Sequence, residues 1–311
     1  MSSGSREIIS YAKETVIGTT PTPFARISVP FTDTSLNAAV TKEDSTTKLA
    51  TRLAQQGTIT SVDYTGDINA EFRFGVFDDL IAAAAFNAWT TDTPAVDSDQ
   101  LVFGGDLRQT FSVLRGYTDI NNYHTFRGMH VNTWNLSIPE TGVVTNTFGL
   151  IGLGRTASSI APVGTVTVPT LTDPFSSISV TDIQIDGVTT VGVACITAFD
   201  FTWDNSMQIQ RCLGQGLEIG KIIETLANGS GSFTMAWSTK GAELYESQFT
   251  NTPMRLTVTL VDGAGNEYVL DLPKIEVTGE LPTGSNTDIL SASYEYRTIE
   301  QAPTLTRTPT V

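Results

Sequence analysis

The side chains that most often carry catalysis or hold metal ions are sparse in this sequence. It contains two histidines, His124 and His130, and two cysteines, Cys195 and Cys212. A zinc site needs three or four nitrogen or sulfur ligands at close spacing, and no carboxylate or thiol stands beside the two histidines. We therefore expect surface or interface histidines, small buried cysteines, and neither a metal site nor a cofactor.

Two further patterns imitate catalytic motifs without matching them. Asp78 and Asp79 are adjacent carboxylates, but neighbours on a helix point apart, so that helix capping is the better interpretation. The glycine-rich run at 149–154 has the wrong spacing for a dinucleotide-binding loop, and no helical pattern follows it. The sequence has no phosphate-binding loop or nucleophile elbow, which indicates a structural protein rather than an enzyme.

The composition favours a β-rich protein with an acidic surface. Hydrophobic residues make up 40% of the 311 residues, and charged residues only 16%. The formal net charge is −15, from 18 basic and 33 acidic residues. Binding of nucleic acid through phosphate neutralisation needs clustered Lys and Arg, so specific DNA binding is not expected. An acidic wall past which DNA slides remains compatible with this charge.

The sequence shows no sign of export or of a membrane segment. No apolar run is long enough for a membrane helix, and the N-terminus lacks the layout of a signal peptide. These features predict synthesis in a reducing cytoplasm and no membrane partner. They also disfavour an outer-membrane barrel, which alternating strands alone could suggest.

The same pattern occurs twice along the chain. Arg52–Gly57 and Arg211–Gly216 both read R-x-x-x-Q-G, and each precedes an alternating strand and a short amphipathic helix. The sequence match that we infer pairs Gly66 with Gly229, Phe74 with Trp237, and Phe86 with Phe249, and it predicts that the aromatic residues are core equivalents. Chance similarity between β-rich segments is the alternative to duplication.

The resulting fold prediction is mainly β with short flanking helices. It consists of two similar β-sandwich or partial-barrel modules in tandem. A hairpin connects them, with a type I′ turn at Asp186-Gly187 between two short strands. The predicted segments are an extended N-terminal arm (1–34), a first module (35–157), a connecting hairpin region (158–197), a second module (198–299) and a C-terminal tail (300–311).

This organisation resembles the duplicated major tail tube proteins of siphophages. The resemblance rests on the order of five segments: Glu14–Pro21, Ser35–Asn37, Thr46–Arg52, the strand Gly66–Phe74 and the helix Phe77–Phe86. It implies a virion protein of the tail whose sheets join into rings, and whose rings stack into a tube through which DNA passes. It also implies contacts with a tape measure protein and with tail terminator or tail tip proteins.

The duplication predicts the make-up of the ring. Tubes of this family are built around six-fold rings of one-module subunits, so that three two-module chains could close a pseudo-six-fold ring. A hexamer with one module outside the ring is the rival. Acidic residues of the last strands, namely Asp271, Glu276 and Glu295, are candidate lumen residues. A capsid or tail decoration protein and a secreted carbohydrate-binding or adhesin domain are the alternative functions.

Overall fold

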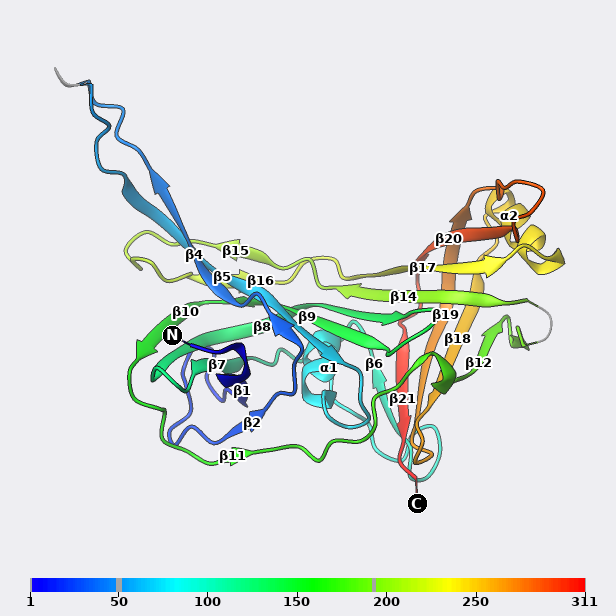
Figure 1. Cartoon of the computed structure of the whole chain (residues 1–311), viewed down its shortest axis with the longest axis horizontal. Helices are drawn as coiled ribbons and strands as arrows, with labels where there is room; N and C mark the ends of the chain where they lie inside the picture. The colour runs from blue at the N-terminus through cyan, green and yellow to red at the C-terminus, as the bar shows by residue number, and fades with distance from the viewer. Residues whose placement is uncertain (1, 49–51, 192–193, 311) are drawn as a thin grey trace.

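The computed structural model describes residues 2–48, 52–191 and 194–310. The chain is mainly β, as predicted, and its two α-helices are short. Long strands cross the middle of the molecule, a hairpin projects at one end, and helix α2 lies at the other end (Figure 1). No helix within these ranges is long and apolar enough to span a membrane. The segment 46–52, which contributed to the resemblance, lies partly outside the described residues.

The first half of the chain contains one α-helix and the strands up to β10. Its elements are a 3-10 turn at Gly4–Arg6, β1 (Glu7–Lys13), β2 (Arg26–Ser28), β3 (Asp33–Thr34), β4 (Asn37–Glu43), β5 (Thr58–Glu71), α1 (Asp78–Ala85), β6 (Asp99–Val102), β7 (Phe111–Tyr117), β8 (Asn122–Ile138), β9 (Thr145–Gly152) and β10 (Gly154–Ser158).

The second half repeats the order of strands and helix. After β11 (Val166–Thr167) and a 3-10 turn at Ser177–Ser179 come β12 (Val180–Ile185), β13 (Val188–Thr189), β14 (Ile196–Asp204), β15 (Gln208–Gln210), β16 (Lys221–Ile223), β17 (Asn228–Ala236), α2 (Thr239–Thr250), β18 (Met254–Val261), β19 (Glu267–Gly279), β20 (Ser291–Thr298) and β21 (Thr304–Thr308).

The two halves have the same neighbour order in their sheets. In the first half the antiparallel order is β1, β7, β8, β9, β5 and then β3 with β4. In the second half it is β12, β18, β19, β20, β17 and β14. Strand β10 pairs with the beginning of β8, and β21 pairs in the same way with the beginning of β19.

The strand registers of the halves also agree. Thr34 lies opposite Ile68, and adding 165 to both numbers gives Phe199 opposite Phe233. The same addition converts Glu43 opposite Thr58 into Gln208 opposite Ile223 at the far end of the hairpin. Both helices end in left-handed residues, Phe86 and Asn251, which are again 165 apart. We call positions related in this way matched positions.

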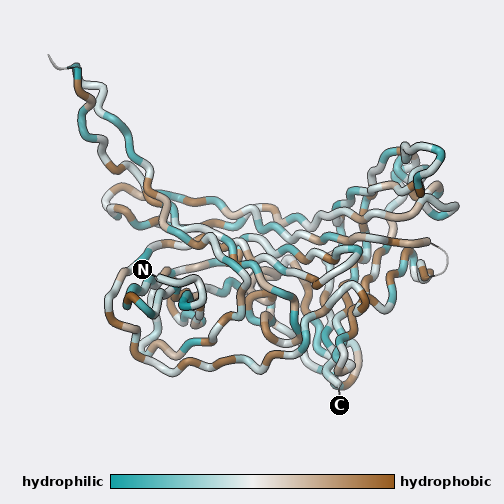
Figure 2. The backbone as a smooth tube through the Cα atoms, viewed as in Figure 1, coloured by the Kyte–Doolittle hydropathy of each residue, from teal (hydrophilic) through white to brown (hydrophobic). Residues whose placement is uncertain are grey.

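Alternation along the strands separates a core face from a solvent face. Ile68, Ala70 and Phe72 are buried in the first half, as are Phe233 and Met235 in the second. Hydrophilic and hydrophobic segments accordingly alternate along many strands (Figure 2). Helix α1 contacts β8 on the core side, and α2 contacts β19 in the same way.

The terminal segments are extended, as expected, but they are not free arms. Strand β1 pairs along its whole length with β7, and its Ile9 and Tyr11 are buried. Strand β21 lies between β19 and β6 and buries Leu305. Apolar residues in both segments therefore pack into the core, as a loose arm would not.

The hairpin between the halves has the predicted turn. Ile185 pairs with Val188, and Asp186 and Gly187 both have positive φ, of 55° and 77°. A type I′ turn requires positive φ at both central residues. The sequence predicts a second strand over Val188–Ile196, but β13 ends at Thr189. Residues 192 and 193 of the expected strand lie outside the described residues.

Candidate assembly interface

The two halves are joined edge to edge by strands β8 and β14. Six consecutive antiparallel pairs connect them, from Ile138 opposite Phe199 to Thr133 opposite Asp204. We call this contact the internal seam. It continues one sheet across both halves, in the order β4, β5, β9, β8, β14, β17, β20 and β19. The seam therefore shows how a second half can extend the sheet of a first half.

Aromatic side chains fill the core beneath the internal seam. Trp134 of β8 is opposite Trp203 of β14, and the Phe103 ring stacks on Trp134 with centroids 5.6 Å apart. Phe103 also contacts Trp203 and Phe201, at 5.3 and 6.0 Å between ring centroids. Burial of such rings supplies much of the free energy of an interface. The internal seam is thus packed like a domain core.

A buried asparagine fastens the end of the internal seam. Asn205 follows β14 and is 3% exposed. Its Nδ2 donates to the carbonyl oxygen of Ala84, in α1, at 2.8 Å and to that of Val131 at 3.2 Å. Its Oδ1 accepts from Trp203 Nε1 at 3.1 Å. All polar atoms of the amide are satisfied, so that this contact orients the two halves rather than leaving an unpaired group.

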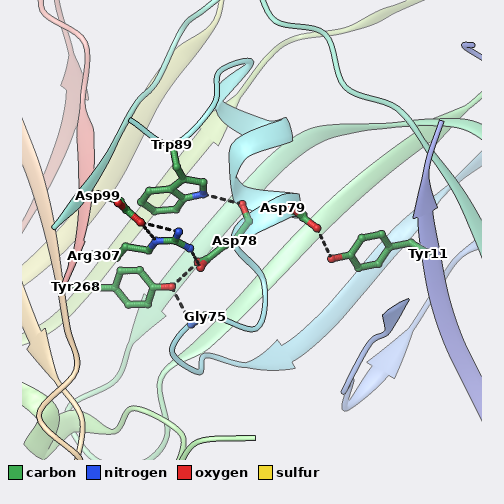
Figure 3. Close-up of polar contacts among 8 residues, drawn as sticks. All are labelled: Tyr11, Gly75, Asp78, Asp79, Trp89, Asp99, Tyr268 and Arg307. Atoms are coloured by element: carbon green, nitrogen blue, oxygen red, sulfur yellow. Dashed lines mark hydrogen bonds and ion pairs between the residues drawn. The ribbon is translucent and has the colours of Figure 1, made fainter. Parts of the chain in front are cut away.

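A second joint lies at the start of helix α1 (Figure 3). The Asp78 carboxylate accepts from Tyr268 Oη of β19 at 2.5 Å and forms an ion pair with Arg307 of β21. Arg307 also pairs with Asp99 Oδ2 at 2.7 Å and lies over the Trp89 ring, 4.6 Å from its centroid. Asp78 thus holds strands of the second half against the helix of the first.

Burial governs the protonation of this joint. It raises the pKa of the Asp78 carboxyl, although the Arg307 guanidinium opposes that rise. Burial and the neighbouring Asp78 raise the pKa of Tyr268 well above its ordinary value. For Arg307 burial lowers the pKa, but Asp78 and Asp99 outweigh it and the net direction is upward. Removing one member would leave charged or polar partners buried without their counterpart.

Asp78 does not cap α1, contrary to the sequence expectation. The residue before the helix is Phe77, and no side chain caps it. Asp78 lies inside the first turn, where its carboxylate is used by Tyr268 and Arg307. Helix α2 is capped by Ser238, whose Oγ accepts from Gly241 N at 3.3 Å.

Several residues of both joints come from one segment that the second half lacks. Phe86 matches Asn251, and Phe111 and Met254 begin the strands that follow the two helices in the same sheet order. The first half has residues 87–110 between Phe86 and Phe111, whereas the second half has only 252–253 between Asn251 and Met254. Trp89, Asp99 and Phe103 all belong to this insertion, and β6 within it pairs with β21. The insertion strengthens the contact between the halves of one chain.

The face of the continuous sheet opposite the core is polar. Directly opposite residues share a face. One row across seven strands consists of Glu71, Thr145, Ser137, Asp200, Ser232, Glu295 and Thr278. The next row consists of Asn69, Thr147, Asn135, Thr202, Ser230, Arg297 and Glu276. None of these residues is buried. We call this surface the polar face.

The three candidate lumen residues are not all on the polar face. Glu276 and Glu295 belong to its two rows, and Glu276 forms an ion pair with Arg297 at 2.6 Å. Asp271 lies before the irregularity in β19, where it is opposite Thr257 and pairs with Arg255 at 2.7 Å. Sequence reasoning missed Glu71 and Asp200, which the sheet register places in the row of Glu295.

The proposed core equivalents are shifted by two residues from the structural match. Gly66 matches Gly231 instead of Gly229, Phe72 matches Trp237, and Phe86 matches Asn251. Gly66 and Gly231 share a cause: an added Cβ would lie 2.4 Å from Leu36 Cα and 2.0 Å from Asp200 O, respectively. Phe74 and Trp237 are partly buried, Phe86 is buried, and Phe249 is 68% exposed, outside the core.

The histidines and cysteines gather into no metal site within the described ranges. His124 Nδ1 lies 3.1 Å from Arg155 on the surface, whereas His130 is 2% exposed and its Nδ1 lies 2.9 Å from Gly128 O. Cys195 and Cys212 are both exposed and unbridged, so the expectation of small buried cysteines is wrong. Cys195 directly precedes β14, and Cys212 follows β15; both lie in segments with few core positions.

Comparison with known proteins assigns the chain to one family. The sequence model of the family described as phage tail tube protein matches residues 4–298 of the 311. A search of curated proteins found no match.

Proposed function

Since the chain belongs to the phage tail tube protein family, we propose that three copies close a ring of six similar modules, two from each chain. The protein is a structural component of the virion tail that assembles into the tail tube. The proposed ring has pseudo-six-fold symmetry, and its closure uses a head-to-tail contact repeated around the axis. The proposed role is structural rather than enzymatic.

The matched registers of the two halves carry this proposal. A constant difference of 165 relates the hairpins, and the helices end at matched left-handed residues. This agreement supports two modules of common design. The boundaries that we propose follow the strands: the first module runs from β1 to β10 and the second from β12 to β21, with 159–179 between them.

The dimensions of such a ring suit a DNA conduit. Each chain would contribute eight strands to the continuous sheet, so that three chains give about 24 strands roughly 4.8 Å apart. With a strand tilt near ~36°, the closed sheet has a backbone diameter of about 45 Å. Side chains reduce this width but leave room for a DNA duplex. In the rival ring of six chains one module of each chain lies outside, so that the internal seam does not contribute to the wall of the ring.

We propose that the polar face lines the lumen. It carries Glu71, Asp200, Glu276 and Glu295 with Arg297 as the basic residue of its two rows. Acidic and hydroxyl side chains repel or weakly contact phosphates, so that DNA passes without specific binding. A tape measure protein would occupy this lumen before DNA does, and tail terminator or tail tip proteins would bind the ends of the tube.

The lumen proposal places the candidates Glu276 and Glu295 in the lumen and the candidate Asp271 outside it. Glu295→Lys should slow genome ejection while tubes still form, because a basic lumen holds phosphates. Asp271→Lys, on a different part of the sheet, serves as the control for a change of the same charge. Ejection followed by fluorescence of released DNA measures both. Equal ejection rates for Glu295→Lys and wild type would remove the polar face from the lumen.

Electron microscopy of assembled tubes tests the ring itself. The expected cross-section contains three chains, with α1 and α2 at similar radius and the polar face toward the axis. Six chains with α2 far outside α1 would overturn the two-module ring. Single particles under all assembly conditions would instead favour the alternative of a decoration protein or an adhesin domain, which the family match does not favour.

A further inference from the structure

We infer that β4 of one chain pairs antiparallel with the end of β19 in the next chain, with Ala39 opposite Thr278. This inference rests on the proposed ring and names the edges and the register that close it. The partner is a second copy of this chain. The internal seam between β8 and β14 provides the template, because each of its strands has a matched strand elsewhere in the chain with an open edge.

The first open edge belongs to β3 and β4. Within the described residues these strands pair only with β5, and β4 is exposed at most of its positions. Their matched strand is β14, which pairs with β17 on one side and with β8 on the other. An unpaired edge presents backbone donors and acceptors to a partner strand. Within the described residues β4 therefore lacks the second neighbouring strand that β14 has.

The second open edge belongs to the end of β19. Strand β18 makes its last pair with β19 at Ile275, and in the described chain Glu276–Gly279 pair on one side only, with β20. The matched stretch of β8 pairs with β14 on that same side. The Gly279 amide donates to Gln248 Oε1 at 3.3 Å. The neutral Gln248 side chain from α2 thus occupies this edge. The position that matches Gln248 in α1 is Ala83, and there β14 pairs with the corresponding edge of β8.

The internal seam fixes the register of the inferred contact. Asp204 lies opposite Thr133. Subtracting 165 from 204 gives Ala39. For β9 and β20 the difference is 146, because Phe148 is opposite Ile68 and Tyr294 is opposite the matched Phe233. Thr133 is opposite Gly149, and Thr278 is opposite Glu295, which is 146 residues beyond Gly149. Thr278 therefore takes the place of Thr133, and Ala39 that of Asp204.

The next pair along the strands is sterically compatible. It brings Ala38 opposite Gly279, in the places of Trp203 and Trp134. Both residues are small, and the Tyr294 ring already fills the core beside Gly279, since an added Cβ there would lie 2.5 Å from it. The Leu36 carbonyl accepts from Arg115 within its own chain, so that the intermolecular pairing begins after it, at Asn37.

Exposed apolar residues accumulate where the inferred contact would cover them. Val40 matches Asn205, and Phe249 matches Ala84, whose carbonyl accepts the hydrogen bond from Asn205. In the isolated chain Val40 is 50% exposed and Phe249 is 68% exposed. Continuing β19 by two residues places Leu281, 56% exposed, where β8 has the buried Leu136. The polar Asn205 contact is thus replaced by an apolar one between chains.

The different chemistry of the two seams distinguishes them. The buried Asn205 amide at the internal seam requires a partner with matching carbonyl oxygens. Val40 and Phe249 at the inferred contact require an apolar partner surface instead. The halves of one chain therefore pair with each other, and the apolar edges remain for the next chain. This arrangement makes chain-to-chain contact head to tail, as closure of a ring requires.

Cysteine cross-linking tests the register directly. Cys195 and Cys212 are exposed, so both are first replaced by Ser. Assembled tubes of Ala39→Cys/Thr278→Cys are then treated with a short thiol–thiol cross-linker, because opposite Cβ atoms lie about 4.5–5.5 Å apart. The matched control, Thr41→Cys/Thr278→Cys, is two residues out of register. We expect at least ten-fold more cross-linked product from the first pair.

The size of the cross-linked product separates this inference from the proposed function. Efficient cross-linking that stops at three chains supports both the seam and the trimeric ring. Efficient cross-linking up to six chains keeps the seam and overturns the trimer. Tubes with three chains per ring by microscopy, but equal cross-linking of the in-register and out-of-register pairs, overturn the seam and keep the ring.

A surface substitution tests the apolar part of the contact. Phe249→Asp should leave the circular dichroism and thermal midpoint of unassembled subunits unchanged, and it should abolish tube formation. Val96→Asp is the control, since Val96 is 77% exposed in the insertion of the first half. Normal tubes from folded Phe249→Asp would overturn the burial of this residue between chains.

Discussion

The two long hairpins of this protein have the same register and different surroundings. The second-half hairpin, which runs from β14 to β17, lies against the first half: Arg211 pairs with Asp63, Glu218 with Arg127, and Leu217 O accepts from Tyr64 Oη at 3.2 Å. The first-half hairpin of β4 and β5 projects away from the body (Figure 1). The difference indicates that a neighbouring module determines the position of the hairpin, and the contact inferred above would supply that neighbour to the first half from another chain.

The largest expected effect comes from shortening the projecting hairpin. Replacing residues 45–56 by a two-residue turn should leave unassembled subunits as stable as wild type and prevent tube formation, because the hairpin would lose its contact with the next chain. Sedimentation of tubes and thermal unfolding measure the two properties. The matched change, replacement of 210–221, removes Arg211 and Glu218 and should instead destabilise the single chain. Tubes formed normally without 45–56 would break the comparison.

The second prediction concerns the joint that holds the halves together. Asp78→Ala should lower the free energy of unfolding by about 3–5 kcal/mol, because it leaves Arg307 and Tyr268 without their buried partner. Asp271→Ala removes a partner of Arg255, which is 55% exposed, and should cost only about 0–1 kcal/mol. Urea denaturation of both variants gives the values. Similar losses would mean that the Asp78 joint adds no more than a surface ion pair.

The third prediction compares two matched aromatic positions. Phe72→Ala should cost about 3–5 kcal/mol, because Phe72 is fully buried. Trp237→Ala should cost less than half of that in unassembled subunits, since Trp237 is only partly buried. Chemical denaturation measures each loss. An equal loss at both positions would show that the second half is as well covered as the first before assembly.

The smallest expected effect is a pH dependence at His130, close to the internal seam. Burial lowers the pKa of His130, so that the folded chain resists protonation, whereas an unfolded histidine binds a proton near pH 6.5. The stabilising contribution is therefore complete above about pH 6.5 and is lost as the pH falls toward the lowered pKa of the folded state. His130→Gln should flatten the stability curve between about pH 7 and 5. Parallel curves for the variant and wild type would contradict this origin.

Sequence patterns predicted the elements of the fold better than their alignment. Alternation located β5 and β17, and Asp186-Gly187 located the type I′ turn. A shift of two residues keeps the alternation of a strand, so that parity could not separate Gly229 from Gly231 as the match of Gly66. The close backbone approach that both matched glycines permit is visible only in three dimensions.

The joints between the halves were beyond sequence reasoning. Asp78 contacts Tyr268 and Arg307, which lie 190 and 229 positions later in the chain, and no local pattern links them. The insertion at 87–110 reads as a polar loop with scattered aromatics, whereas its Phe103 is buried against aromatic rings of β8 and β14. Phe249 resembled a core residue because its helical spacing is apolar, but it is 68% exposed in the single chain, and the inferred contact between chains would cover it.

The internal seam also has a consequence for the kinetics of assembly. A ring of six separate modules needs five successful encounters between subunits, and each depends on their concentration. In a three-chain ring half of the seams form during folding of each chain, where the effective concentration of the partner strand is fixed by the linker at 159–179. In the proposed ring two encounters would then suffice before closure, so that we expect the nucleus to form at lower protein concentration and early in the supply of new subunits.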